Sequence, residues 1–201
     1  MIPITPRPEP QNFARDVRLP GNAFLRRVRN PSKSDWDSNR LWRKALPDLY
    51  SSYGGICAYS ASWIPATVQA SVDHFQPKST HKHLAFEWTN YRLSSKEMNS
   101  NKGSLTILDP FTIQSGWFIL KFDTFRIEAE QGLQQQLEQA VNNTVTALKL
   151  NDDAYIDNRY AILKDYSAGD CTIGFLERRY PFLASELHRQ GRVLSILGTI
   201  R

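Results

Sequence analysis

The sequence predicts an α+β fold, in which a small β-containing core is embedded in mostly helical N- and C-terminal segments. Two stretches, 71–75 and 117–122, have strand-like composition, whereas the apolar residues of 131–150 recur with the period of an α-helix. The chain has 201 residues, of which 41% are hydrophobic and 22% are charged. These values are typical of a globular protein that is long enough to bury a core.

Three consecutive segments are expected within a single compact unit. Residues 1–50 form a basic, proline-rich arm and helix, residues 51–112 form the core, and residues 113–201 form a mainly helical extension that packs on this core. Four of the first ten residues are prolines, which disfavour a helix interior and a central strand. Residues 1–12 are therefore expected to lie extended on the protein surface or on a partner.

The N-terminal segment is expected to contain two helices after the arm. The first is a short helix over residues 21–29, and the second is an amphipathic helix that begins at Ser34 or Asp35 and ends near residue 47 or 50. Two tryptophans of this second helix would either stack on nucleobases or anchor the segment in the core, and the anchoring role is favoured: Trp36 and Trp42.

The central segment contains the signals of a hairpin followed by a helix. Glycines at 54–55 mark a turn, residues 56–60 are expected to form a short strand or knuckle, and residues 71–75 are expected to form a strand. Residues 92–100 have the composition of a short helix, which Gly103 would end. These elements are only weakly marked in the sequence.

The C-terminal segment is predicted to be mainly helical. A hairpin is expected first, and a strong amphipathic pattern follows it, with leucine and valine on one face and glutamine and asparagine on the other. The predicted elements are strands at 117–122 and 124–127, helices at 131–150, 153–169, 172–180 and 182–190, and a closing strand or short helix at 193–200.

Positive charge is concentrated near the N-terminus. The net formal charge of the chain is +5, and residues 1–45 contain ten Lys and Arg against four Asp and Glu, a local net charge of +6. Such a segment binds a polyanion by releasing counterions, although a solvated surface without a ligand is the simpler alternative. Three arginines of this segment are candidates for contacts with nucleic acid: Arg26, Arg27 and Arg29.

The sequence also limits the class of protein. No apolar run approaches the roughly 20 residues that span a bilayer, and the N-terminus has no continuous apolar segment of signal-peptide length. A soluble, cytoplasmic protein without a membrane partner is therefore expected. Cys57 and Cys171 fit no disulfide framework and no zinc-binding spacing, so both are expected to be free thiols.

Four polar residues of the central segment form a pattern that suggests catalysis. Asp73 and His74 are adjacent, and Asn90 and Asn99 follow them. Carboxylate and amide oxygens suit a hard ion such as Mg²⁺, and imidazole accepts a proton at neutral pH. Phosphodiester hydrolysis requires such a cation and such a base. Each residue alone has a structural explanation, since asparagine is common in turns, but the combination favours a catalytic site.

At these residues the sequence resembles the HNH (ββα-metal) endonucleases. It is most similar to a bacterial subgroup with the motif DHFxPKS, a middle Asn, and NxxKG. Residues 73–79 here read Asp-His-Phe-Gln-Pro-Lys-Ser, and residues 99–103 read Asn-Ser-Asn-Lys-Gly. The resemblance covers residues 53–110, and it implies a hairpin, a loop and a helix in this order.

The resemblance implies a role for each residue of the motif. His74 is expected to be the general base, with Asp73 and Asn99 as ligands of a divalent metal, Mg²⁺ or Mn²⁺. Asn90 is expected to organise the loop and to orient the histidine without contacting the metal. Two lysines are candidates for contacts with phosphate, the second of which has a structural alternative: Lys102 and Lys78.

The sequence departs from the family at the expected zinc ligands. Many HNH proteins hold this fold with two Cys-x-x-Cys pairs around a structural zinc ion. The corresponding stretches here read Cys-Ala-Tyr-Ser at 57–60 and Ser-Lys-Glu-Met at 95–98, so one thiol of four remains. A closed zinc site needs four ligands. No structural zinc is expected, and packing against the flanking helices would stabilise the core instead.

The sequence therefore predicts a metal-dependent endonuclease that cuts or nicks DNA, although its residues do not distinguish DNA from RNA. Relatives in the subgroup often act in bacterial anti-phage defence together with an ATPase or another sensor subunit, which implies such a partner. One alternative is a non-catalytic nucleic-acid-binding or adaptor subunit that retains the fold. A second, weaker alternative is a metallohydrolase that acts on another phosphodiester.

Overall fold

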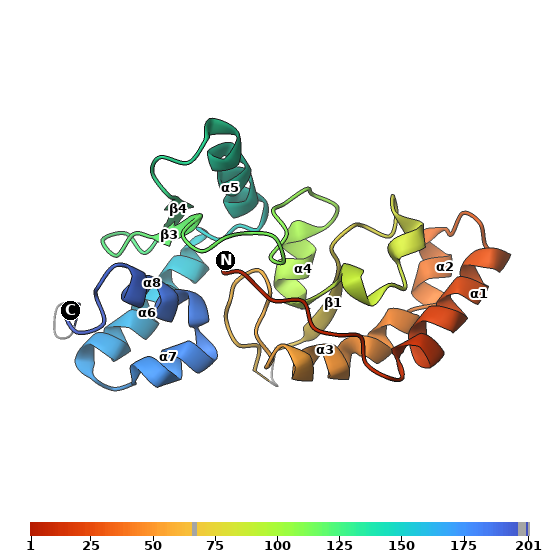
Figure 1. Ribbon diagram of the computed structural model, residues 1–201, viewed down its shortest axis with the longest axis horizontal. Helices are drawn as coiled ribbons and strands as arrows, with labels where there is room; N and C mark the ends of the chain where they lie inside the picture. Colours follow the sequence, from red (N-terminus) through yellow and green to blue (C-terminus); the bar gives the residue numbers. More distant parts are fainter. Residues whose placement is uncertain (66–67, 197–199, 201) are drawn as a thin grey trace. The chain divides into compact units, whose positions relative to one another are not determined.

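The computed structural model describes residues 1–65, 68–196 and 200. Its contacts divide the chain into two compact units. The N-terminal unit comprises Thr5–Cys57 and Ile64–Ser104, and the C-terminal unit comprises Met1–Ile4, Ala58–Trp63 and Leu105–Arg201. Figure 1 draws the helices and strands of both units.

Helices and two small antiparallel sheets make up the secondary structure, so the chain belongs to the mixed α+β class that the sequence predicted. Among the described residues, no helix is both long enough and apolar enough to cross a membrane. The element predicted at 193–200 lies partly outside the described residues, and the part from 193 to 196 forms turns.

The N-terminal arm and the first helix match the predicted arrangement. Residues 1–10 contain no helix or strand. A π-helical turn, η1 (Ala14–Arg18), continues into α1 (Leu19–Arg27), which begins two residues before the predicted start. Pro20 follows this π-helical turn directly and, because it has no N–H group, donates no hydrogen bond to the turn before it.

The predicted amphipathic helix of the N-terminal segment is divided into three short ones, and its predicted cap was wrong. They are α2 (Lys33–Ser38), the 3₁₀ helix η2 (Leu41–Ala45) and α3 (Leu46–Ser52). The cap is Ser32, whose Oγ accepts a hydrogen bond from the Asp35 N–H at 3.3 Å, while the Asp35 carboxylate accepts one from the Ser32 N–H at 2.8 Å. This reciprocal capping box fixes the start of α2.

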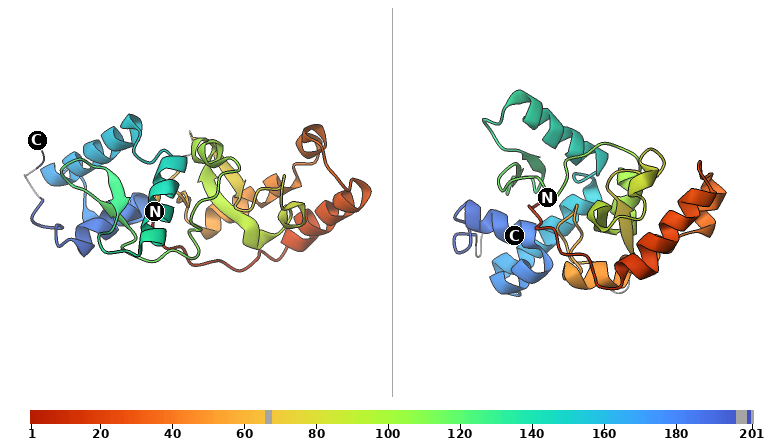
Figure 2. Two further views of the ribbon diagram at one scale, coloured as in Figure 1. Left: turned by 90° about the horizontal axis from the view of Figure 1, so that it is seen from above. Right: turned by 45° about the vertical axis from the view of Figure 1, so that its right-hand side comes forward.

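A hairpin and a helix form the centre of the N-terminal unit. Strand β1 (Ala70–His74) pairs antiparallel with β2 (Tyr91–Ser95), so that His74 lies opposite Tyr91. Helix α4 (Lys96–Lys102) follows directly and packs against both strands (Figures 1 and 2). The prediction of a helix over 92–100 was wrong for its first four residues, because these residues complete the hairpin and the Ser95 side chain caps α4.

The loop between β1 and β2 spans residues 75–90 and contains two 3₁₀ turns, η3 (Lys82–Leu84) and η4 (Trp88–Asn90). An aromatic cluster packs beside it, with the Trp42 and Phe86 ring centroids 6.2 Å apart and those of Trp36 and Trp42 6.1 Å apart. Trp36 and Trp42 are both buried, which confirms that they anchor the N-terminal segment in the core.

The C-terminal unit contains a second hairpin and four helices. Strand β3 (Phe118–Leu120) pairs with β4 (Ile127–Ala129), three residues after the predicted start of the partner strand. The four helices lie within or close to the predicted ranges: α5 (Gln135–Ala147), α6 (Asp153–Ala168), α7 (Ile173–Arg179) and α8 (Pro181–Arg189).

A close approach of α1 to Phe86 provides a test of the packing in the N-terminal unit. A methyl group at Gly21 would overlap the Phe86 ring. We expect Gly21→Ala to lower the free energy of unfolding by about 1–3 kcal/mol, in spite of the better helix propensity of alanine. In the matched change Gly174→Ala in α7, the methyl group meets the Arg178 and Thr172 side chains at ordinary contact distances of 3.6 and 3.9 Å. Urea unfolding should show no loss for this control, and equal behaviour of the two variants would contradict the packing.

Candidate active site

A cavity of about 580 Å³ lies in the N-terminal unit at the end of β1. Three of the motif residues, Asp73, His74 and Asn99, line it together with Lys78. The cavity is completed by residues of the N-terminal segment, of the loop after β1 and of the turn after α4: Pro31, Lys33, Trp36, Asp37, Trp42, Val72, Pro77, Ser79, Gly103 and Ser104. The fold thus brings β1, α4 and the N-terminal segment to one hollow.

His74 is the last residue of β1 and is buried. Its Nε2 atom lies 2.9 Å from the carbonyl oxygen of Ala85. Since a carbonyl oxygen only accepts hydrogen bonds, Nε2 carries the proton and Nδ1 is the basic nitrogen. The rings of Trp42 and Tyr91 lie nearly perpendicular to the imidazole, at centroid distances of 5.0 and 5.3 Å. These two contacts fix the plane of the imidazole.

The surroundings of His74 keep the imidazole neutral. Burial is the main cause and lowers its pKa from 6.5 to about 3, and the positive charges of Lys78 and Lys102 act in the same direction. The hydrogen bond to Ala85 opposes this shift. The imidazole is therefore an available but weak base throughout the neutral pH range.

Asp73 is paired with Lys102 beneath the cavity. The Lys102 ammonium nitrogen lies 3.2 Å from Asp73 Oδ1 and 3.1 Å from Oδ2, and it also donates to the carbonyl oxygen of His74 at 2.9 Å. The Lys102 side chain has no exposed surface. The prediction that Lys102 contacts phosphate does not fit this placement, since the ammonium group faces the interior of the protein.

Asn99 lies in α4 and is held by its amide nitrogen. Nδ2 donates to the hydroxyl oxygen of Ser71 at 3.1 Å and to the carbonyl oxygen of Val72 at 3.3 Å. Because the nitrogen is fixed by β1, the amide oxygen is the atom that Asn99 offers to a ligand. Asn99 and Asp73 thereby provide one amide oxygen and one carboxylate at the same cavity.

The oxygen atoms of Asp73 and Asn99 are suitable ligands for a hard divalent ion. A carboxylate has about four acceptor positions, and the Lys102 ammonium group contacts two oxygens from the side of α4. Mg²⁺ is commonly held by one or two protein oxygens, while water and phosphate supply the other ligands. In the described part of the chain there is no group of three His, Cys, Asp or Glu residues suited to a metal, so a site built on Asp73 and Asn99 would rely on such external ligands.

Asn90 does not line the cavity but holds the loop beside it. Its Oδ1 accepts from the Gln76 N–H at 2.8 Å, and its Nδ2 donates to the carbonyl oxygens of Gln76 and Leu84 at 3.0 and 3.1 Å. The backbone of Asn90 also accepts a hydrogen bond from Phe75. These contacts fix both ends of the loop that presents Ala85 to the imidazole of His74.

Lys78 is the cation that borders the cavity itself. Its ammonium nitrogen lies 5.2 Å from the centre of the Trp42 ring, and within the described residues it forms no hydrogen bond or ion pair. Burial lowers the pKa of Lys78, while the charges of Asp73 and Asp37 counteract this effect. A half-buried ammonium group without an acceptor is suited to an anionic ligand.

The three candidate arginines, Arg26, Arg27 and Arg29, are exposed on and after α1 and do not line the cavity. The unit that carries them has fifteen Lys and Arg against eight Asp and Glu, a formal charge of +7. The C-terminal unit has ten against twelve, a charge of −2. All of the positive excess therefore belongs to the unit that contains the cavity.

Sequence reasoning missed the N-terminal contribution to the cavity. Trp42, Lys33 and Asp37 border it, although only the tryptophan had been singled out, and then as a packing residue. No motif marks these positions. The signal that was present is the local density of tryptophan and basic residues over 33–44.

The positions expected to have lost zinc ligands serve packing and capping. Cys57 is buried with its sulfur 3.8 Å from the Ser94 hydroxyl oxygen, and Met98 is fully buried. The Ser95 hydroxyl accepts the Met98 N–H at 3.2 Å and so begins α4. These residues therefore contribute hydrophobic packing and a helix cap to the N-terminal unit.

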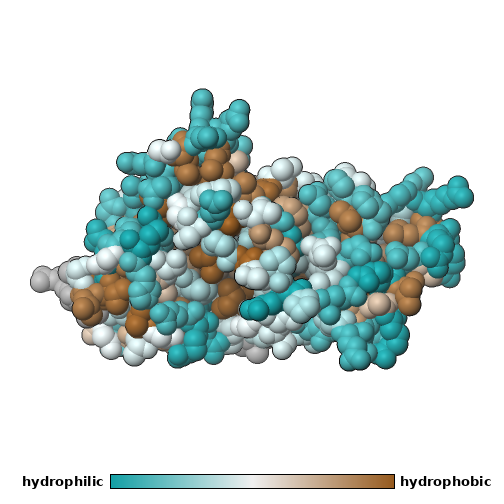
Figure 3. All heavy atoms as spheres, in the orientation of Figure 1, coloured by the Kyte–Doolittle hydropathy of each residue, from teal (hydrophilic) through white to brown (hydrophobic). Residues whose placement is uncertain are grey.

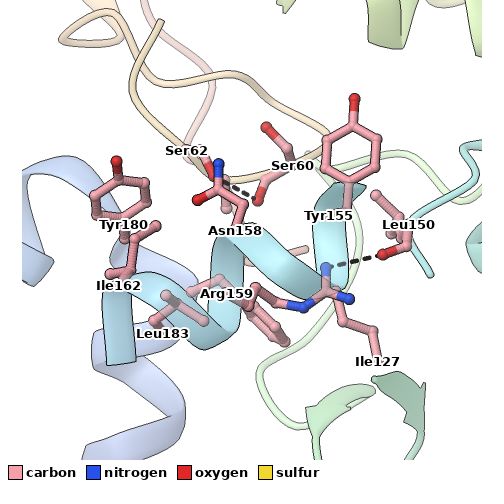
Figure 4. A pocket seen from close by; sticks show the side chains of 12 residues that line it. Ser60, Ser62, Ile127, Leu150, Tyr155, Asn158, Arg159, Ile162, Tyr180 and Leu183 are labelled. Atoms are coloured by element: carbon pink, nitrogen blue, oxygen red, sulfur yellow. Dashed lines mark hydrogen bonds between the residues drawn. The ribbon is translucent and has the colours of Figure 1, made fainter. Parts of the chain in front are cut away.

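A second cavity, of about 90 Å³, lies in the C-terminal unit (Figure 4). Its most polar wall residue is Arg159, which donates to the carbonyl oxygens of Phe125 and Leu150 at 2.6 and 2.8 Å. This guanidinium group is engaged with the backbone of the unit. The cavity contains none of the predicted site residues.

No protein-family model matches the sequence, and no curated protein matches it either. The functional assignment therefore depends on the chemistry of the cavity in the N-terminal unit. The resemblance of the motif to the HNH endonucleases stays a prediction.

The neutral state of His74 gives a pH dependence of stability. Above pH 6.5, His74 is neutral in the folded and in the unfolded protein. Below pH 6.5 it takes up a proton in the unfolded chain, but not in the folded protein, where its pKa is about 3. This histidine should lower the free energy of unfolding by about 2 kcal/mol between pH 7 and pH 5. Urea unfolding of wild type and His74→Gln in EDTA should show this loss for wild type only. An imidazolium signal of His74 in NMR spectra at pH 5 would contradict it.

Proposed function

We propose that the chain is a metal-dependent endonuclease that hydrolyses phosphodiester bonds in DNA. The observation that supports it best is the gathering of Asp73, His74 and Asn99 around one cavity that Lys78 also borders. These residues provide a base, two oxygen ligands and a cation for an anionic substrate. The order of β1, β2 and α4 is also that of the ββα-metal core, which we propose as the fold of this part.

His74 would act on the nucleophilic water. Its Nε2 proton is held by Ala85, so Nδ1 would accept the proton of a water molecule as this attacks phosphorus. Trp42 and Tyr91 keep the ring in one orientation, which lowers the entropic cost of reaching the reactive geometry. Lys78 would bind a non-bridging oxygen of the scissile phosphate and balance its growing charge.

Asp73 and Asn99 would hold the divalent metal. When bound, such an ion stabilises charge on the phosphate and the leaving oxygen and makes its coordinated water more acidic. Because His74 is unprotonated at neutral pH, its imidazole is available to accept a proton from such a water molecule.

The charge distribution supports a nucleic-acid substrate. The N-terminal unit carries a charge of +7, and hydrophilic side chains project from the visible face around α1 and α2 (Figure 3). Exposed arginines neutralise backbone phosphates and release counterions, without reading sequence. The ATPase or sensor partner and the role in phage defence stay predictions from the resemblance.

Cleavage of supercoiled plasmid by the purified protein tests the proposal. We expect nicking or linearisation with Mg²⁺ or Mn²⁺ and none with EDTA. His74→Ala should lower the rate by about 10²–10⁴-fold, because the general base is lost. Asn99→Ala should raise the metal concentration required, whereas Asn101→Ala, on the same helix but outside the cavity, should behave as wild type. Cleavage that persists in His74→Ala would place the site elsewhere, and DNA binding without cleavage would favour the adaptor.

Binding of short duplex DNA tests the role of the arginines. Replacing Arg26, Arg27 and Arg29 by alanine in the His74→Ala protein should weaken binding similarly for unrelated sequences. The slope of log K against log salt should fall by about 0.9 for each phosphate that the variant no longer neutralises. A control variant removes three exposed positive charges from the C-terminal unit: Arg126, Lys164 and Arg178. Equal weakening in both variants would show that net charge, and not this surface, determines binding.

A further inference from the structure

Lys102 is a fully buried lysine, which is rare unless the charge is paired. Its position in the last turn of α4 directs the ammonium group to the end of β1, where it contacts both carboxylate oxygens of Asp73 and the carbonyl oxygen of His74. The Phe75 ring closes the site, with its centroid 5.8 Å from the ammonium nitrogen. The three polar contacts of the ammonium group are therefore to Asp73 and His74, the proposed metal ligand and the proposed base.

These contacts have two consequences. The ammonium group compensates the charge of Asp73 inside the protein, so the carboxylate is held in place when no metal is bound. The same positive charge also repels any divalent ion that approaches this carboxylate. The residue that prepares the site for the metal thus weakens its attraction for the metal.

We propose that Lys102 is a positioning residue that acts as the resident counter-ion of Asp73, keeping the site folded when no metal is bound and limiting its affinity for divalent ions. This inference rests on the proposed role of Asp73 as a metal ligand. It assigns different roles to the two lysines of the motif. Lys78 borders the cavity and is placed for phosphate, whereas Lys102 lies beneath the carboxylate and is placed for Asp73.

The variant Lys102→Met has an unbranched side chain that is one atom shorter and carries no charge. In EDTA, the buried carboxylate would lose the positive charge that contacts both of its oxygens, and we expect the unfolding temperature to fall by about 10 °C or more. Mn²⁺ should restore most of this loss, because the ion replaces the missing positive charge. The wild-type unfolding temperature should change much less with Mn²⁺. Titration with Mn²⁺, followed by calorimetry, should show binding to the variant that is about tenfold tighter or more.

Three further variants make the test specific. Lys96→Met, at an exposed position of the same helix, should change neither the unfolding temperature nor the Mn²⁺ affinity. Asp73→Asn leaves the ammonium group buried without its carboxylate, so it should be destabilised and Mn²⁺ should not restore it. The double variant Asp73→Asn with Lys102→Met removes both charges and should unfold near the wild-type temperature without binding Mn²⁺.

The results separate this inference from the proposed function. Stability of Lys102→Met that is equal with and without Mn²⁺, or affinity no tighter than that of wild type, would overturn the role of Lys102 even if the wild type cleaves DNA. If Lys102→Met fails to fold in any buffer, the double variant decides, since its failure too would show that packing and not charge is the role of Lys102. Metal-dependent stability of Lys102→Met in a protein that cuts no DNA would support the inference and reject the nuclease.

Discussion

A buried ion pair between Asp73 and Lys102 holds the end of β1, which carries two of the candidate catalytic residues, against α4. Charges in the interior of a protein are tolerated only with a partner and with further hydrogen bonds. Lys102 fulfils both conditions, because it contacts the carboxylate and the backbone of His74 together. The pair joins the last turn of α4 to the end of β1, so a shift of the helix would displace both residues.

Buried polar groups in the loop after β1 also have hydrogen-bond partners. Asn90 fixes the two ends of this loop with three side-chain hydrogen bonds, and Ala85 within it accepts from His74. Among the described residues, no buried side-chain nitrogen or oxygen lacks a partner. These polar contacts and the packing of Met98 stabilise the hairpin and the helix.

Elements that depend on local sequence signals were predicted better than elements that depend on pairing with a distant strand. Helix α6 was predicted closely, because its apolar spacing and the glycine that follows it act within the helix itself. Strand β2 was assigned to a helix, since its residues become a strand only through pairing with β1, which precedes it across the loop 75–90. The break between α2 and η2 was missed for another reason. The capping box at Ser32 was visible in the sequence, but the later apolar spacing suggested one continuous helix.

The sequence predicted which residues form the candidate site, but it did not predict that Asp73 and His74 are buried. The motif predicted that Asp73, His74 and Asn99 would lie close together, and all three line one cavity. Asp73 and His74 are buried, and Trp36 and Trp42 of the N-terminal segment, which no motif marks, form part of the cavity wall. This burial determines the chemistry. Burial lowers the pKa of His74 to about 3, so the imidazole is unprotonated at neutral pH and can accept a proton. This proton acceptor and the oxygens of Asp73 and Asn99 lie at one cavity, which is the arrangement that the proposed metal-assisted hydrolysis requires.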